Sequence, residues 1–149
     1  MQDRNSDRSV GVENVYNRAL KLLKRRQHSS FELQRKLEAR GYSKSSVVAV
    51  LVLLREQDYL NDERFAEIFL DNLIKYKTFG FYGLKGKLLQ RGIDKGIIDD
   101  LLSSFGFEDE KRIALKILEK KRERDPVKLA RSLSAKGFRS QVIKDVLNF

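Results

Sequence analysis

The chain has 149 residues, with 31 lysines and arginines against 21 aspartates and glutamates, which gives a formal net charge of +10. Apolar residues make up 41% of it, enough for a packed core, whereas 35% charged residues excludes the long apolar run of a membrane span. The lack of cysteine excludes thiolate nucleophiles, disulfides and sulfur-ligated metals, so we expect a reducing, cytoplasmic compartment. Residues 1–14 contain no apolar stretch typical of a secretory signal, and we expect them to form a flexible tail.

Apolar residues and glycine recur along the rest of the chain at offsets of 51 and 45 residues, which indicates an internal repeat. Steps of three and four are typical of helices, so each copy is predicted to hold three short helices, with a tight turn at the glycine between the second and third. The predicted repeats span residues 15–60, 61–107 and 108–149. The matched positions are Leu33, Leu37 and Gly41; then Leu84, Leu88 and Gly92; then Leu129, Leu133 and Gly137.

In the first predicted repeat, Ser29 and Glu32 form a capping box at the start of the second helix, and Gly41 is expected to adopt a positive φ at its end. The apolar, β-branched segment Val47–Leu54 would also suit a buried strand. We favour a core helix there, because the matched segments of the other copies have helical spacing. His28 is the only histidine, and we expect it to be solvated or to cap a helix, since no carboxylate constellation accompanies it.

The second predicted repeat starts at Asn61 and Asp62, and its distinctive segment is the glycine- and aromatic-rich loop Phe79–Gly83. A phosphate-binding loop is disfavoured, because Leu88 follows Lys87 where such a loop needs serine or threonine. The aromatic side chains of the loop could stack on bases or staple the loop to a neighbouring repeat, and we favour the staple. Acidic pairs and runs are attributed to helix starts rather than to a metal site, so no metal is predicted.

In the third predicted repeat, Asp125 is an N-cap and Pro126 occupies the first helical position. A single unit of this size would bury too little apolar surface to be stable alone. We therefore expect an all-α fold in which three tandem three-helix repeats stack into an elongated, curved array.

The turn at each glycine is similar to the turn of DNA-reading helix-turn-helix proteins. A recognition helix must present polar side chains to base edges, whereas Val47–Leu54 is apolar nearly throughout. The matched helix of the second copy carries Asp99 and Asp100, which phosphates would repel. We therefore interpret the third helix of each repeat as core.

Positive charge concentrates in the first and third predicted repeats. Residues 15–60 carry ten basic and four acidic side chains and residues 108–149 carry twelve and seven, whereas residues 61–107 carry seven of each. Charged helix faces are commonly just solvated, yet the summed cations predict weak, salt-dependent contact with single- and double-stranded DNA. The candidate DNA- or filament-binding residues are Arg18, Lys21, Lys24, Arg25, Arg35, Lys75, Lys77, Lys85, Lys121, Arg124, Lys128 and Arg131.

Four stretches of the chain form a recognisable pattern. They are Ala19–Arg26 leading into His28, Ser29, Glu32, Leu33 and Leu37; Tyr59–Ala66; Gly80–Leu84; and Leu88–Ile93. Through these stretches the chain resembles the RecX family of bacterial recombination regulators, across nearly its whole length from Val15 to Phe149. Asn61 stands where the family more often has aspartate, Phe81 where it often has proline, and Gly83 where a basic residue is frequent.

The resemblance implies a protein without catalytic activity or cofactor that binds the RecA nucleoprotein filament in its groove and contacts DNA. It further implies modulation of RecA ATP hydrolysis, filament extension and strand exchange, and a place in DNA repair, homologous recombination and the SOS response. A stand-alone helical DNA-binding or architectural protein stays open as an alternative, because of the net charge and the turn geometry. We expect a monomer with no membrane partner.

Overall fold

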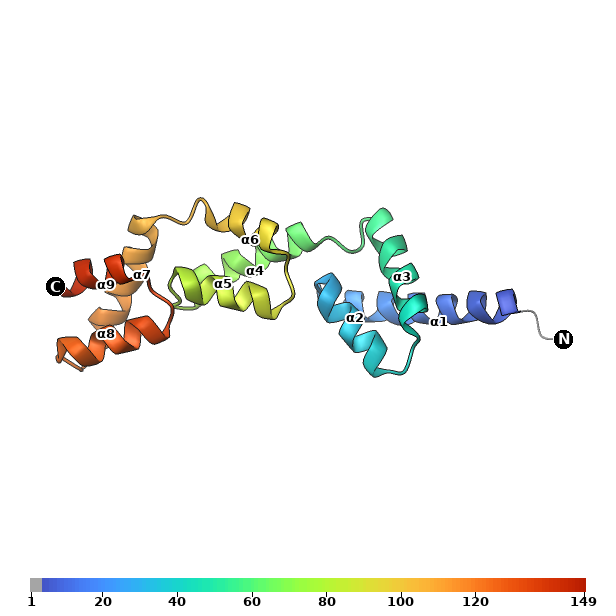
Figure 1. The fold of residues 1–149 in the computed structure, drawn as a ribbon, viewed down its shortest axis with the longest axis horizontal. Helices are drawn as coiled ribbons and strands as arrows, with labels where there is room; N and C mark the ends of the chain where they lie inside the picture. The colour runs from blue at the N-terminus through green and yellow to red at the C-terminus, as the bar shows by residue number, and fades with distance from the viewer. Residues whose placement is uncertain (1–3) are drawn as a thin grey trace. The chain divides into compact units, whose positions relative to one another are not determined.

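The computed structural model describes residues 4–149, and within this range all secondary structure is helical (Figure 1). The predicted all-α fold is therefore confirmed. No helix of residues 4–149 combines the length and the apolar character that crossing a bilayer requires. The helices are α1 (Arg4–Arg25), α2 (Ser30–Ala39), α3 (Lys44–Glu56), α4 (Asp62–Tyr76), α5 (Phe81–Gln90), α6 (Lys95–Leu102), α7 (Phe107–Lys120), α8 (Pro126–Ala135) and α9 (Ser140–Leu147).

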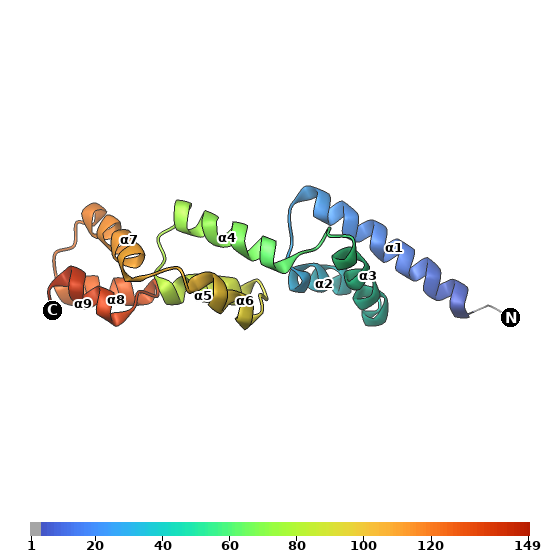
Figure 2. The same ribbon diagram turned by 90° about the horizontal axis from the view of Figure 1, so that it is seen from above.

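By its packing the chain divides into two units, Met1–Phe65 and Ala66–Phe149. In the first unit, α3 packs against both α1 and α2; in the second, α5 packs against α6, and α9 packs against α7 and α8 (Figure 2). The helices occur in the order expected for three repeats. The repeat boundaries and the stacking of the repeats remain predictions.

The core of the first unit is aliphatic and is contributed by all three of its complete helices. Leu33 and Leu37 of α2 and Val47 and Leu54 of α3 are fully buried, as is Val15 of α1. Burial of a side chain of this size stabilises a fold by about 1.5–3 kcal/mol. The repeat pattern read from the sequence therefore identifies the residues that join α1, α2 and α3.

Residues 4–14 of the expected tail are helical, because α1 begins at Arg4, and the flexibility of the tail stays a prediction. Val12 packs against the core cluster of the first unit, and Val15 is fully buried one turn later. The apolar stripe of α1 thus extends further towards the N-terminus than we expected. Residues 1–3 of the expected tail lie outside the described residues.

The predicted glycine turns are confirmed at all three positions. Gly41, Gly92 and Gly137 follow α2, α5 and α8 directly after the C-cap residue and have φ values of +92°, +74° and +84°. A side chain is strained at such φ values, whereas glycine adopts them freely. After Gly92 and Gly137 the next amide donates to the last full turn of the preceding helix, as in a Schellman motif.

The predicted helix starts are also confirmed. Ser29 and Glu32 form the capping box of α2, and the Asp125 carboxylate accepts a hydrogen bond from the backbone amide two residues on, with Pro126 at the first position of α8. The Asn61 side chain accepts a hydrogen bond from the Arg64 amide at 2.9 Å, which places Asn61 at the N-cap of α4. Each cap satisfies an amide that lacks a partner within its own helix.

The segment Val47–Leu54 is helical, as favoured over a strand, but only half of it is core. Its inner face is buried, whereas Val48, Val52 and Leu53 are 45%, 44% and 38% exposed. The interpretation of this third helix as core is therefore wrong for its outer face. The physical reason is that α1 and α2 both pack on the inner face of α3.

The aromatic loop of the second unit docks on the turn between α8 and α9. The amides of Gly80 and Tyr82 donate to the carbonyls of Lys136 and Gly137 at 3.0 and 2.8 Å. These contacts are made by the backbone, so stapling by the aromatic side chains stays a prediction. The loop in the structure is shorter than the predicted Phe79–Gly83, because α5 begins at Phe81 and includes the last three of these residues.

Candidate nucleic-acid interface

The outer face of α1 carries the first cluster of candidate cations. Lys21, Lys24 and Arg25 are exposed on it, because the opposite face is anchored by the fully buried Ala19. None of the three cations forms an ion pair with a described residue, so their charge remains available to a polyanion. Arg18 is only half-buried, and its Nε atom is buried without a hydrogen-bond partner among the described residues. Arg18 therefore lies at the edge of this face rather than on it.

On α2, Arg35 is exposed and pairs with an aromatic ring. Its guanidinium carbon lies 5.5 Å from the ring centroid of Phe31, and Phe31 is itself 42% exposed. An exposed ring beside a cation can stack on a nucleobase while the cation neutralises a phosphate. Phe31 was not among the predicted binding residues, although its position four residues before Arg35 on one helix was a readable signal.

In the second unit, the candidate cations of residues 75–85 differ in accessibility. Lys75 and Lys77 are exposed, whereas Lys85 is half-buried. The Lys75 ammonium lies 5.2 Å from the ring centroid of Tyr76, which is 69% exposed. A second cation–aromatic pair is thus open to solvent at the end of α4.

Around the start of α8, Arg124, Lys128 and Arg131 are exposed. Lys121 is half-buried, and its ammonium donates a hydrogen bond to the Ser132 hydroxyl. A guanidinium nitrogen of Arg124 donates to the Lys121 carbonyl at 3.2 Å. Lys121 thus bonds within the chain at the linker between α7 and α8, and its place among the candidate binding residues stays a prediction.

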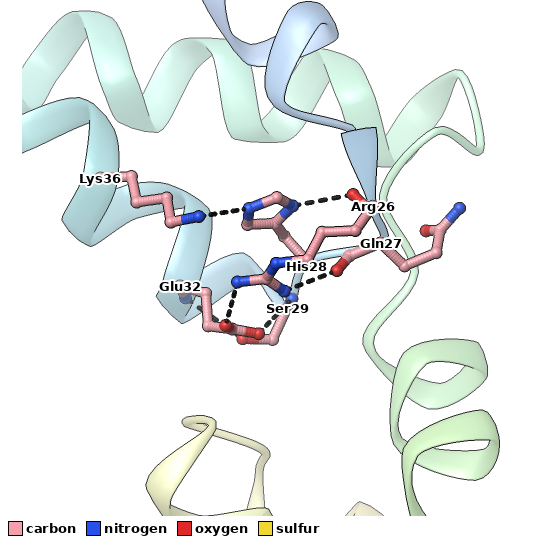
Figure 3. Close-up of polar contacts among 6 residues, drawn as sticks. All are labelled: Arg26, Gln27, His28, Ser29, Glu32 and Lys36. Atoms are coloured by element: carbon pink, nitrogen blue, oxygen red, sulfur yellow. Dashed lines mark hydrogen bonds and ion pairs between the residues drawn. The ribbon is translucent and has the colours of Figure 1, made fainter. Parts of the chain in front are cut away.

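The linker between α1 and α2 is held by a compact polar cluster (Figure 3). Arg26 forms an ion pair with Glu32 at 3.0 Å and donates to the Gln27 carbonyl at 2.9 Å. Glu32 also accepts from the Ser29 amide at 3.3 Å to complete the capping box. These contacts fix where α2 starts relative to the end of α1, and therefore where Arg35 lies relative to the α1 cations.

His28 sits in the same cluster and is 1% exposed, which corrects the expectation of a solvated side chain. Its Nε2 lies 2.9 Å from the Lys36 ammonium, which can only donate, so Nδ1 carries the proton and donates to the Arg26 carbonyl at 2.9 Å (Figure 3). Burial lowers the pKa of His28 below its usual value of 6.5, and the charges of Arg26 and Lys36 lower it further. With both ring nitrogens occupied, His28 is a structural residue.

The buried neutral imidazole makes the stability of the first unit depend on pH. The pKa of His28 is lower in the folded chain than in the unfolded chain, so below pH 6.5 the unfolded chain binds a proton more readily. The free energy of unfolding is therefore highest above pH 6.5 and declines as the pH falls below that value. Moving from about pH 7.5 to about 5.5 should therefore lower the free energy of unfolding measured by urea titration. The same decline should be smaller in His28→Gln, whereas equal declines in both chains would contradict this role.

Carboxylates in the described part of the chain do not assemble into a metal-binding group. In that part, no three or more histidine, cysteine, aspartate or glutamate side chains lie together so that they could hold a metal ion. Glu110 is fully buried, but it accepts from the Phe81 amide, the Arg139 amide and Arg139 Nε at 2.9, 2.9 and 2.6 Å. From the sequence, the acidic run Glu108–Glu110 is attributed to favourable charge at a helix start. In the structure, Glu110 instead binds the backbone amides at the starts of α5 and α9.

Two protein-family models match the chain. The model described as RecX, first three-helix domain, matches residues 16–52, and that of the second three-helix domain matches residues 61–102. The Lactobacillus salivarius RecX crystal structure shares the fold, with a TM-score of 0.84, 22% identity, and coverage of 94% of this chain and 96% of that one.

Similarity to curated proteins extends over most of the chain. Regulatory protein RecX of Caldanaerobacter subterraneus is 31% identical over 142 residues, which covers 93% of this chain and 72% of that protein. Regulatory protein RecX of Clostridium botulinum is 31% identical over 139 residues, covering 87% and 65%, and that of Bacillus subtilis is 35% identical over 114 residues, covering 76% and 43%. The chain thus spans between 43% and 72% of the length of these relatives. On these matches, the chain belongs to the RecX family of regulatory proteins.

Proposed function

We propose that this chain is a non-enzymatic regulator that binds RecA nucleoprotein filaments, contacts their DNA, and modulates RecA ATP hydrolysis, filament extension and strand exchange. The proposal includes action as a monomer in the cytoplasm, in homologous recombination, DNA repair and the SOS response. It also includes the division into three tandem repeats at residues 15–60, 61–107 and 108–149. Family membership supports the regulatory role, and the exposed cations support the contact with nucleic acid.

The observation that carries the DNA contact is the arrangement of cations in the first unit. Lys21, Lys24 and Arg25 project from one face of α1 without ion pairs to described residues, and the Phe31–Arg35 pair adds an exposed aromatic ring on α2. Lysines and arginines of such a face neutralise DNA phosphates and release the cations condensed on them into solution, which favours binding at low salt. The ring provides a stacking surface that tolerates any base.

The regulatory role is tested by adding the protein to RecA from the same cell, assembled on single-stranded DNA. We expect the rate of ATP hydrolysis to change at substoichiometric ratios of this chain to RecA, because one bound regulator affects many filament subunits. A DNA-only titration run in parallel separates filament binding from binding to bare DNA. An unchanged rate over a broad concentration range would refute the proposal.

The alternative, a stand-alone DNA-binding or architectural protein, is motivated by the helix–glycine–helix turns. Its signature would be tight, sequence-dependent binding to naked duplex DNA. The exposed Asp99 and Asp100 of α6 and the apolar outer face of α3 argue against insertion of these helices into a groove. Weak binding with a steep salt dependence is the result expected from the exposed cations.

The α1–α2 surface can be tested by charge reversal. The triple variant Lys21→Glu/Arg25→Glu/Arg35→Glu should weaken DNA binding. The plot of log association constant against log salt concentration should also become shallower, its slope decreasing in magnitude by about 2 to 3. The thermal unfolding midpoint should stay nearly unchanged, since all three side chains are exposed.

A matched control reverses three exposed cations that lie outside the candidate set, Lys95, Lys116 and Lys144. This control changes the net charge by the same amount, so it should lower affinity much less if position rather than total charge decides binding. Equal losses of affinity in the two triple variants would show that the α1–α2 surface has no special part in binding.

A further inference from the structure

The outer face of α3 is apolar and has no covering element in the first unit. Val48, Ala49, Val52 and Leu53 are all exposed, and their spacing of one, four and five residues places them on one side of the helix. The opposite side supplies the fully buried residues of the core. A contiguous apolar surface of this kind is unfavourable in water unless something binds it.

The matched helices of the chain show that the fold does not need an apolar face here. In the register of the internal repeat, the four positions of α3 correspond to two aspartates and two serines on α6, all exposed. In the third copy the four matched positions lie on α9 and in the residues after it, and three of these residues are polar. The corresponding residues are Asp99, Asp100, Ser103 and Ser104, and then Lys144, Asp145, Asn148 and Phe149.

The charges beside the face indicate the chemistry of its partner. Lys44 and Arg55 are exposed and lie along one edge, four residues before Val48 and three residues after Val52, and neither forms an ion pair with a described residue. Glu56, also exposed, lies at the C-terminal end of the face, four residues after Val52. Residues 15–60 carry ten basic and four acidic side chains. A second copy of the chain would offer Glu56 as one carboxylate for two cations and would bring the remaining positive charge against itself, whereas carboxylates on a partner would pair with both Lys44 and Arg55.

We propose that the α3 face, formed by Val48, Ala49, Val52 and Leu53, docks an amphipathic helix of a partner protein whose apolar stripe is flanked by carboxylates. Small and medium aliphatic side chains allow two helices to approach closely, and the edge cations fix the orientation of the bound helix. The inference goes beyond the proposed function, because it assigns a protein-binding surface on α3 that is separate from the cations of α1 and α2.

The test uses two synthetic helical peptides of about 18 residues with the same leucine stripe, one flanked by glutamates and the other by lysines. Each is titrated into the isotope-labelled full chain and followed by NMR. We expect the glutamate-flanked peptide to shift the amide signals of α3 and to bind at least about tenfold more tightly than the lysine-flanked one. Equal binding of the two peptides, or shifts confined to other helices, would overturn the proposal.

A variant with the α6 residues on α3, Val48→Asp/Ala49→Asp/Val52→Ser/Leu53→Ser, should lose the glutamate-flanked peptide and keep its affinity for DNA. The matched control Ile68→Ser/Leu115→Asp/Val127→Ser removes other exposed apolar side chains and should bind the peptide like the unmodified chain. If the four-residue variant loses its helical circular dichroism, Val52→Ser alone must weaken peptide binding, and unchanged binding would count against the proposal.

Sedimentation of the unmodified chain decides between a partner helix and a second copy. We expect a concentration-independent monomer, whereas a dimer that the four-residue variant abolishes would show that a second copy covers the face and would overturn the proposal. The peptide titration and the sedimentation experiment do not involve RecA. An absence of effect on ATP hydrolysis by RecA would therefore refute the proposed function and leave the proposal for the α3 face untouched.

Discussion

Replacing Glu110 by alanine should destabilise the second unit by roughly 3–5 kcal/mol, because the change removes a fully buried carboxylate that pairs with the partly buried Arg139 side chain. It also leaves the amides of Phe81 and Arg139 without their acceptor, and these amides begin α5 and cap α9. A buried donor that loses its acceptor costs about 1–3 kcal/mol. Guanidinium titration followed by circular dichroism measures the loss of stability.

Hydrogen exchange provides the local readout of the same change. The amides of Phe81 and Arg139 should exchange faster in Glu110→Ala, since their present acceptor is removed. Glu108→Ala is the matched control, because Glu108 is an exposed carboxylate in the first turn of the same helix, and it should change stability by less than about 0.5 kcal/mol. A loss in Glu110→Ala no larger than in this control would show that the buried carboxylate does not join the helices.

The parts of the fold that the sequence predicts are those decided by local chemistry. A residue with positive φ after a helix favours glycine whatever surrounds it, so Gly41, Gly92 and Gly137 could be placed from the repeat pattern alone. The capping box at Ser29 depends on a residue only three positions away. The exposed face of α1 follows from the 3.6-residue period, which correctly places Lys21 and Arg25 outside.

The features that the sequence could not predict depend on partners distant in the chain. Glu110 contacts amides 29 positions away on both sides, and neither partner is marked by an unusual residue type. His28 lies in a polar stretch, yet Lys36 and the linker around it enclose its ring. The burial of one face of α3 was also not predictable in detail, because Val48 and Val52 make its outer face as apolar as its inner one.

The candidate binding residues also separate into those that local helix periodicity predicts and those whose surroundings depend on distant contacts. Lys24 and Arg35 are exposed because their helices present a regular outer face, and a periodicity argument suffices to find them. Lys121 has the same charge, but its hydrogen bond to Ser132, eleven residues away, occupies it within the chain. Cation counts from sequence therefore overestimate the free positive surface wherever a lysine bridges two helices.

Gly80→Ala should destabilise the second unit by about 1–3 kcal/mol or more, because the new methyl group would meet backbone rather than side chains. An ideal Cβ at this position would lie 2.4 Å from Phe138 Cα and 2.5 Å from Phe138 N. Backbone atoms at the turn between α8 and α9 cannot rotate away as a side chain can. The start of α5 must therefore move off the turn and break the Gly80 and Tyr82 hydrogen bonds to it.

Gly86→Ala is the matched control and is expected to have the opposite sign. Gly86 lies within α5, and a Cβ there would meet no atom within 4 Å, so alanine should stabilise the helix by about 0.5–1 kcal/mol. Both changes add one methyl group, Gly80→Ala at the N-cap of α5 against the α8–α9 turn and Gly86→Ala inside the helix facing open space. The thermal unfolding midpoints of the two variants should therefore shift in opposite directions. A higher midpoint for Gly80→Ala would show that the start of α5 lies further from the α8–α9 turn than the 2.4 Å approach of a Cβ to Phe138 Cα requires.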